Sequence, residues 1–208
     1  MVERIIAYYD GSNFYHLSMS NYGLKRFDFV LITKSLLRNT QQLVKLKYFN
    51  SPVNQQEDPE AYKDQQRFFA KIKNDPVIEL YLGKLVTRNL HEVWVNCKVC
   101  GSCKAEDVNC PKCGRLLDLD DVKRTVEKGV DVKLAMTLLL DAINDKFDTA
   151  FLMSSDADFV PVIDYVINVL GKKVVYCHFP SPFTSDLVTA CHKNTMLIRK
   201  ETLEENAT

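Results

Sequence analysis

Short apolar runs alternate with helical patterns along most of this 208-residue chain. Each run has the length of a buried strand and is followed by turn-forming or polar residues. The predicted strands are residues 4–9, 43–49, 77–85, 149–153, 173–177 and 196–198, and the predicted helices are residues 12–22, 28–38, 59–73, 131–144, 159–170 and 184–191. This alternation predicts an α/β fold, a three-layer sandwich with a mostly parallel central sheet between helices. The polar residues 201–208 are expected to fray.

The predicted helix 131–144 has a strong hydrophobic periodicity. Its apolar residues recur with the spacing of one helix face: Val132, Ala135, Met136, Leu139, Leu140 and Ile143. We expect this stripe to pack against the sheet. Asp131 lies one turn before Ala135, so its side chain is expected to share the buried face and point inward.

Four aspartates stand where a parallel sheet builds a ligand site. Asp10 follows the strand 4–9, Asp156 and Asp158 follow the strand 149–153, and Asp131 opens a helix. Ligands of open α/β sheets bind outside the carboxyl ends of the strands, so neighbouring strands would bring these side chains together. Clustered carboxylates raise one another's pKa, and their hard oxygens are ligands that Mg²⁺ and Mn²⁺ prefer. Such ions can polarise a phosphodiester and activate a water molecule.

Each of these aspartates also has an ordinary structural explanation, because an Asp after a strand is often a helix N-cap or a turn residue. Asp158 in particular could simply cap the helix that contains Pro161. The set is more informative than its members because it converges on one edge of one predicted sheet.

Five cysteines interrupt the alternation between residues 91 and 117, a region with little that could form a core. Cys97 and Cys100 form one Cys-x-x-Cys-Gly knuckle, and Cys110 and Cys113 form a second. Two such pairs predict a closed tetrahedral zinc site in a small, zinc-ribbon-like insertion. Cys103, which is also spaced correctly from Cys100, and His91 remain alternative ligands. A redox role is less favoured because no thioredoxin-like pattern surrounds the pairs.

Basic residues gather in and beside the insertion: Arg88, Lys98, Lys104, Lys112, Arg115, Lys123, Arg124 and Lys128. They could form a rim that holds phosphates near the aspartates, and Trp94 could stack on a base. A solvated charged face and a buried anchor for the insertion are the competing explanations, and they are favoured for any single residue.

Three segments resemble, in order, the motifs of the NYN domain family of the PIN-like nuclease superfamily. They are Asp10-Gly11-Ser12-Asn13, then Lys128-Gly129-Val130-Asp131-Val132 followed by Leu134-Ala135, and Ser154-Ser155-Asp156-Ala157-Asp158-Phe159. The family usually has Gly where Ser155 stands. The resemblance implies a PIN-like domain over residues 1–208, with the zinc module at 91–117 as an insertion.

The resemblance also implies a metal-dependent ribonuclease. Asp10, Asp131, Asp156 and Asp158 would be catalytic ligands of Mg²⁺ or Mn²⁺, with Asn13 beside them. Many relatives carry a further Asp about six residues after Asp131, where this chain has Thr137. The next acid, Asp141, is one turn too far, so the departure could weaken the activity.

Composition and missing motifs limit the function classes. Lys and Arg balance Asp and Glu at 27 each, which argues against coating nucleic acid by bulk charge but not against a nuclease. No apolar run reaches the length of a membrane span, and no signal peptide is recognisable, so we expect a cytoplasmic protein without a membrane partner. Seven cysteines in that compartment would be thiols or metal ligands rather than disulfides.

A metal-dependent ribonuclease acting on single-stranded RNA is therefore the leading hypothesis. The alternative is a non-catalytic RNA- or protein-binding module on the same fold, and a protein partner or homo-oligomer remains open. A phosphatase is less favoured because Asp10-Gly11-Ser12 lacks a second Asp. The chain has no Gly-x-Gly-x-x-Gly turn for a dinucleotide. Its four histidines show no catalytic triad.

Overall fold

The computed structural model describes residues 2–89, 93–97, 101–105, 107–109, 113–118 and 123–207. The chain divides into two compact units. The first, the core unit, comprises Met1–Lys84 and Gly129–Thr208, and the second, the inserted unit, comprises Leu85–Lys128.

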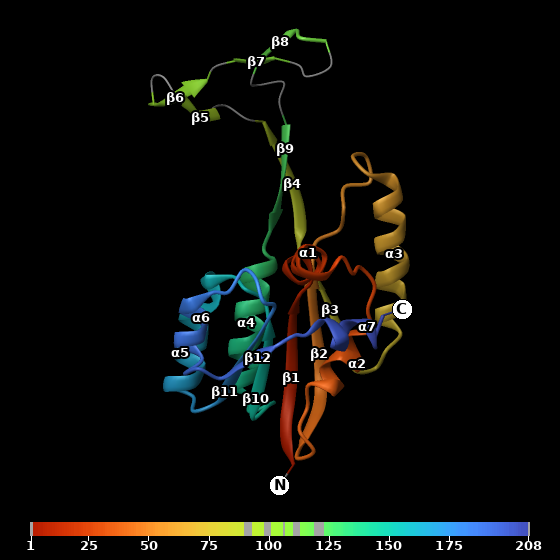
Figure 1. Ribbon diagram of the computed structural model, residues 1–208, viewed down its shortest axis with the longest axis vertical. Helices are drawn as coiled ribbons and strands as arrows, with labels where there is room; N and C mark the ends of the chain where they lie inside the picture. The colour runs from red at the N-terminus through yellow and green to blue at the C-terminus, as the bar shows by residue number, and fades with distance from the viewer. Residues whose placement is uncertain are drawn as a thin grey trace. The chain divides into compact units, whose positions relative to one another are not determined.

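A six-stranded sheet forms the centre of the core unit (Figure 1). Its strand order is β12-β11-β10-β1-β2-β3, and every neighbouring pair is parallel. The strands are β1 (Glu3–Asp10), β2 (Gln41–Asn50), β3 (Ile78–Leu82), β10 (Thr149–Met153), β11 (Lys173–His178) and β12 (Thr195–Leu197). The predicted parallel sheet is confirmed, and β1 lies at its centre between β10 and β2.

Helices cover both faces of this sheet. The helices are α1 (Gly11–Tyr22), α2 (Phe29–Ser35), α3 (Pro59–Lys73), α4 (Val130–Ile143), α5 (Val160–Asn168), α6 (Ser185–Ala190) and α7 (Lys200–Glu204), with a 3-10 turn η2 (Ala157–Phe159) before α5. Alternate residues of β1 enter two separate hydrophobic clusters, as the pleat of a strand requires. One cluster holds buried residues of α1, α2, α3 and α7, and the other holds buried residues of α4, α5 and α6. The sheet therefore lies between two layers of helices, as the predicted three-layer architecture requires.

The buried face of α4 differs from the predicted one. Ala135 and Leu139 of the predicted stripe pack against the core beside the buried Leu134 and Leu138, whereas Val132, Met136, Leu140 and Ile143 of that stripe are exposed. Asp131 lies one turn before Leu134 and Ala135 of the packed face, as expected, but the residue itself is exposed and not buried. The helix is apolar around much of its circumference, so periodicity alone allowed two phases. The face of α4 that packs against the sheet also carries a buried acid, Asp141.

Two boundaries also differ from the sequence-based expectation. The strand predicted at 77–85 is two strands, because β3 ends at Leu82 and β4 (Lys84–Asn89) begins after Gly83. The segment after residue 200 does not simply fray, because α7 buries Leu203. The carbonyl of Asn206 also accepts a hydrogen bond from the Asp28 amide at 2.9 Å, which ties this segment to the start of α2.

The inserted unit is built from pairs of short strands. β5 (Val93–Cys97) pairs antiparallel with β6 (Gly101–Ala105), and β7 (Asp107–Asn109) pairs antiparallel with β8 (Leu116–Asp118). β4 pairs with β9 (Lys123–Lys128). The unit therefore contains the region 91–117 for which a zinc module is predicted.

Candidate functional site

The pairing of β1 with β10 brings two predicted site segments together. Tyr9 is aligned with Met153, so Asp10 at the end of β1 and Ser154 after β10 meet at one edge of the sheet. The Ser154 hydroxyl donates a hydrogen bond to Asp10 Oδ2 at 3.1 Å. The two strands are therefore neighbours, which is the condition under which Asp10 and Asp156 reach the same edge of the sheet.

Asp10 is both the end of β1 and the N-cap of α1. Its Oδ1 accepts a hydrogen bond from the backbone amide of Asn13 at 3.0 Å, as a capping aspartate does. The side chain is nevertheless buried. Gly11 follows it because a Cβ there would lie 2.4 Å from the ring of Tyr48, far inside van der Waals contact. The glycine thus lets α1 begin close above β2.

The turn after β10 holds its polar groups in a fixed order. The Asp156 amide donates to Ser154 Oγ at 3.3 Å, and the Asp158 amide donates to Asp156 Oδ1 at 2.9 Å. Asp156, not Asp158, caps the short η2 turn, and α5 begins without a side-chain cap. Asn13 Oδ1 accepts a hydrogen bond from the Ser155 amide at 3.1 Å, so Asn13 joins α1 to this turn.

Asp131 enters the site from the first turn of α4. The preceding Gly129 has φ = +84°, a left-handed conformation that suits glycine, and α4 begins directly after it. Nearby protein atoms partly desolvate the Asp131 carboxylate and raise its pKa, and the negative charges of Asp156 and Asp158 raise it further. The exposed Asp131 therefore lies within electrostatic range of the turn after β10.

Burial raises the pKa of Asp10 to about 6, even though hydrogen bonds from the Asn13 amide and the Ser154 hydroxyl favour its ionised form. The charges of Asp131 and Asp156 add to this upward shift. Within the residues that the structure describes, none of the four aspartates forms an ion pair with Lys or Arg. The structure thus brings the four predicted carboxylates into one electrostatically coupled group.

The model of the NYN domain matches residues 4–197 of this sequence. The chain belongs to the NYN domain family. This membership implies a PIN-like nuclease fold. A protein of unknown function from Vibrio parahaemolyticus has a similar crystal structure, with a TM-score of 0.59 and 18% sequence identity over 97% of this chain and 96% of that chain. No curated protein matches this sequence.

The ligand atoms that the four aspartates of this NYN domain offer are of the type that a hard divalent cation prefers. All four side chains offer carboxylate oxygens, and a cation would relieve the repulsion that raises the pKa of Asp10 and Asp131. In the described ranges, however, no three His, Cys, Asp or Glu side chains stand close enough to form a ready-made metal site.

Asp141, the acid after Thr137, has a structural role in this NYN domain. It is buried on α4 and accepts contacts from Lys47 Nζ at 2.6 Å, Lys146 Nζ at 3.0 Å and the Tyr8 hydroxyl at 2.8 Å. Burial alone would raise its pKa, but these partners lower it on balance. Asp141 therefore does not replace the acid that many relatives carry in the place of Thr137.

Several residues beside the site were not predicted from the sequence. Ser154 is the only one with a local signal, since it precedes the acidic turn. The Tyr176 hydroxyl lies 2.8 Å from Ser155 Oγ, and Thr184 Oγ1 donates to the Ser155 carbonyl at 2.7 Å. Tyr176 and Thr184 follow Ser155 by 21 and 29 positions, so only the fold places them there.

The zinc-site residues of the inserted unit stay predictions. Cys100, Cys110 and His91 lie outside the described residues. Cys97 and Cys103 belong to β5 and β6, and Cys113 is exposed. Two cysteines outside this region, Cys177 and Cys191, are buried in the core.

The basic rim and the stacking role of Trp94 stay predictions. Lys98 and Lys112 lie outside the described residues, and Arg115 and Lys128 are exposed.

Among the described residues, no helix is long and apolar enough to cross a lipid bilayer.

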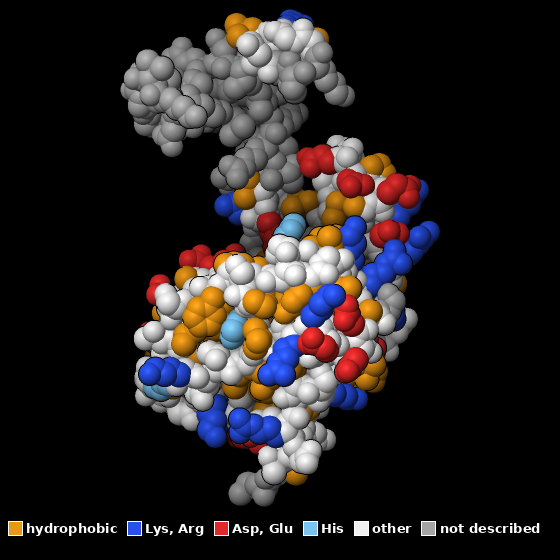
Figure 2. Space-filling model, in the orientation of Figure 1, with side chains coloured by type: hydrophobic (Ala, Val, Ile, Leu, Met, Phe, Trp, Pro, Cys, Tyr) orange, Lys and Arg blue, Asp and Glu red, His pale blue; other side chains and the backbone are white. Residues whose placement is uncertain are grey.

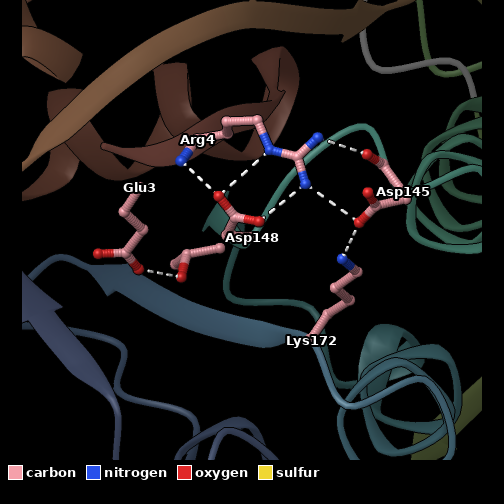
Figure 3. A network of polar contacts seen from close by, with 6 residues as sticks. Glu3, Arg4, Asp145, Asp148 and Lys172 are labelled. Atoms are coloured by element: carbon pink, nitrogen blue, oxygen red, sulfur yellow. Dashed lines mark hydrogen bonds and ion pairs between the residues drawn. The ribbon is translucent and has the colours of Figure 1, made fainter. Parts of the chain in front are cut away.

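A second group of aspartates lies at the opposite end of the sheet, where β1 begins (Figure 3). Arg4 Nη2 contacts Asp148 Oδ1 at 2.8 Å and Asp145 Oδ1 at 3.0 Å, and Lys172 also pairs with Asp145. The hydrogen bonds from Arg4 lower the pKa of Asp148 to about 2. Asp145 and Asp148 thus form ion pairs with basic side chains, whereas the four aspartates of the candidate site form none within the described part of the chain.

Proposed function

We propose that this NYN domain protein is a divalent-metal-dependent ribonuclease that hydrolyses RNA phosphodiester bonds at Asp10, Asp131, Asp156 and Asp158. The observation that carries the proposal is the mutual electrostatic coupling of these carboxylates without a compensating Lys or Arg among the described residues. A protein keeps like charges together at a stability cost, so such a cluster points to a bound cation or to chemistry.

The chain's own residues hold the carboxylates in defined positions. Asn13 and Ser154 orient Asp10, and the Asp158 amide orients Asp156. Mg²⁺ or Mn²⁺ held by these oxygens would supply polarisation of the phosphodiester and a lower pKa for the attacking water. Hydrolysis by this route needs no nucleophilic side chain, which agrees with the absence of a triad in the sequence.

The inserted unit is proposed to hold a structural Zn²⁺ through Cys97, Cys100, Cys110 and Cys113. Two Cys-x-x-Cys-Gly knuckles support this ligand set. Metal analysis of the purified protein should give one zinc per chain, and Cys113→Ser should lower it, whereas Cys191→Ser should not. Equal zinc content in both variants would exclude Cys113 as a ligand.

A non-catalytic RNA- or protein-binding role is the second candidate. Thr137 stands where many relatives have a further acid, and the buried ion pairs of Asp141 exclude that residue as a substitute. The described residues also lack a group of three ready metal ligands. If these features prevent metal binding, the same edge of the sheet would bind RNA without cutting it.

Cleavage of a labelled single-stranded RNA with Mn²⁺ or Mg²⁺ separates the two candidates. The wild type is compared with Asp10→Asn and Asp156→Asn, and with Asp145→Asn as a matched control at the other end of the sheet. We expect metal-dependent cleavage that both site variants lose and the control keeps. No cleavage of several RNAs by folded, zinc-loaded wild type would favour the binding role.

A further inference from the structure

Phe183 presents a large aromatic ring to solvent beside the acidic site. It lies between β11 and α6, and 53% of it is exposed. Its ring meets the ring of His178 edge to face, with centroids 5.0 Å apart. The His178 ring lies 5.1 Å from Tyr176, which is fully buried. These three rings form a continuous aromatic cluster, the aromatic platform, in which Tyr176 lies in the core and Phe183 is the exposed member.

The aromatic platform is joined directly to the acidic turn. The Tyr176 hydroxyl contacts Ser155 Oγ at 2.8 Å, and Thr184, the neighbour of Phe183, donates to the Ser155 carbonyl at 2.7 Å. Ser155 immediately precedes Asp156. β10 and β11 are parallel neighbours, so their carboxyl ends reach the same edge of the sheet. In Figure 2, acidic side chains lie above α5 and α6, and hydrophobic side chains gather over α6 on the same face.

A second element holds the segment that carries Phe183. Asn21 of α1 accepts a hydrogen bond from the Ser181 amide at 3.1 Å and donates one to the Ser181 carbonyl. The segment is thus anchored to α1 on one side and to the acidic turn on the other. A ring held in this way loses little conformational freedom when a flat ligand stacks on it.

We infer that Phe183, supported by His178, stacks on an unpaired nucleobase of single-stranded RNA next to the phosphate at the acidic site. This inference rests on the proposed function and adds how the RNA strand is held. Exposed aromatic and histidine rings bind splayed bases through their faces, largely independent of sequence. Bases within a duplex are already stacked, so the platform would select unpaired RNA.

The test measures affinity by fluorescence anisotropy, using a labelled 12-nucleotide single-stranded RNA with no Mg²⁺ or Mn²⁺ added, so that binding is read without cleavage. Phe183→Ala should weaken Kd roughly 5- to 100-fold, and Phe183→Trp should keep it near wild type. Tyr165→Ala is the matched control, because this aromatic side chain on α5 is similarly exposed at 47%. It should leave Kd unchanged.

An RNA series with single abasic positions identifies the stacked base. Cleavage of the intact RNA with Mn²⁺ maps the scissile phosphate. One abasic position beside that phosphate should weaken binding to the wild type but not to Phe183→Ala. The stacking role of Phe183 would be excluded if Phe183→Ala left Kd unchanged or if Tyr165→Ala weakened binding equally. It would also be excluded if the abasic position weakened binding to Phe183→Ala as much as to the wild type.

The outcomes also separate this inference from the proposed function. Metal-dependent cleavage that needs Asp10 but not Phe183 would leave the nuclease and remove the platform. Base-dependent binding through Phe183 without cleavage would keep the platform on a binding protein. Wild type that neither binds nor cleaves the RNA would overturn both.

Discussion

The two ends of β1 carry aspartates in opposite electrostatic states. At its start, Arg4 and Lys172 surround Asp145 and Asp148, and hydrogen bonds from Arg4 lower the pKa of Asp148 to about 2 (Figure 3). At its end, burial and neighbouring carboxylates raise the pKa of Asp10 to about 6.

The difference distinguishes two roles for the same residue type. Aspartates paired with cations stabilise the fold, whereas aspartates that have no ion pair among the described residues lower its stability, which is the pattern that the proposed metal site would explain. The buried Asp141, which Lys47 and Lys146 neutralise, belongs to the first class. The comparison can be tested by changing one aspartate at each end.

Catalysis should show the largest contrast. Asp10→Asn should lower metal-dependent RNA cleavage by at least about 100-fold, because charge stabilisation by a bound metal contributes several kcal/mol. Asp148→Asn should leave the rate within about twofold, since it lies at the other end of the sheet. Single-turnover cleavage of both variants measures this, and equal losses would mean that the two ends are not functionally distinct.

Metal binding should depend on the aspartates at the end of β1 and not on those at its start. Mn²⁺ at about 100 times its Kd should stabilise the wild type by roughly 2.7 kcal/mol, which corresponds to a rise in Tm of roughly 5–10 °C. Asp145→Asn should keep this rise, and Asp10→Asn should lose most of it. Thermal melts with and without Mn²⁺ measure the shift. A full rise in Asp10→Asn would place the bound metal elsewhere.

Without divalent metal, replacing an aspartate by Asn should raise the free energy of unfolding at the end of β1 and lower it at the start of β1. Asp10 has a folded-state pKa near 6 against an unfolded value of 3.8, so its ionisation costs stability as pH rises from about 4 to above 6. Asp10→Asn should therefore raise the free energy of unfolding at pH 7 by about 1–3 kcal/mol. Urea denaturation at pH 4 and pH 7 checks this, because the gain should be absent at the lower pH.

The smallest effect is expected at the start of β1. Asp148 has a lowered folded-state pKa of about 2, so its stabilising contribution is present above about pH 4 and is lost as pH falls toward 2. Asp148→Asn should lower the free energy of unfolding at pH 7 by no more than about 1 kcal/mol, because solvent screens this partly exposed pair. A stability gain in this variant would contradict the assignment of a structural role.

Local sequence patterns located the four site aspartates but not the way in which they meet. Asp10 and Asp156 were recognisable because each follows a short apolar run, yet their proximity depends on the pairing of β1 with β10. Asp131 reaches the group from an exposed position on α4, although a buried one was expected. The helix periodicity placed Asp131 beside the packed residue Ala135 but could not give its exposure, and the roles of the four aspartates stay predictions.

The phase of α4 shows why periodicity was insufficient. Val132 and Met136 are as apolar as Leu134 and Leu138, so hydrophobicity could not choose between the two faces. The buried face carries Asp141, a residue that normally argues for solvent. Contacts from Lys47 of β2 at 2.6 Å, from Lys146 at 3.0 Å and from the Tyr8 hydroxyl at 2.8 Å compensate for burying this acid.

The sequence by itself determined the alternation of strands and helices, the placing of Asp10 and Asp156 after strands, and membership of the NYN domain family. These features depend on local patterns and motif order. The tertiary structure alone decided the strand order, the buried face of α4, the ionisation of Asp10 and Asp148, and the approach of Tyr176 and Phe183 to the acidic turn. The physical reason is that burial and electrostatic interactions depend on distances between residues far apart in the chain, which no local pattern contains.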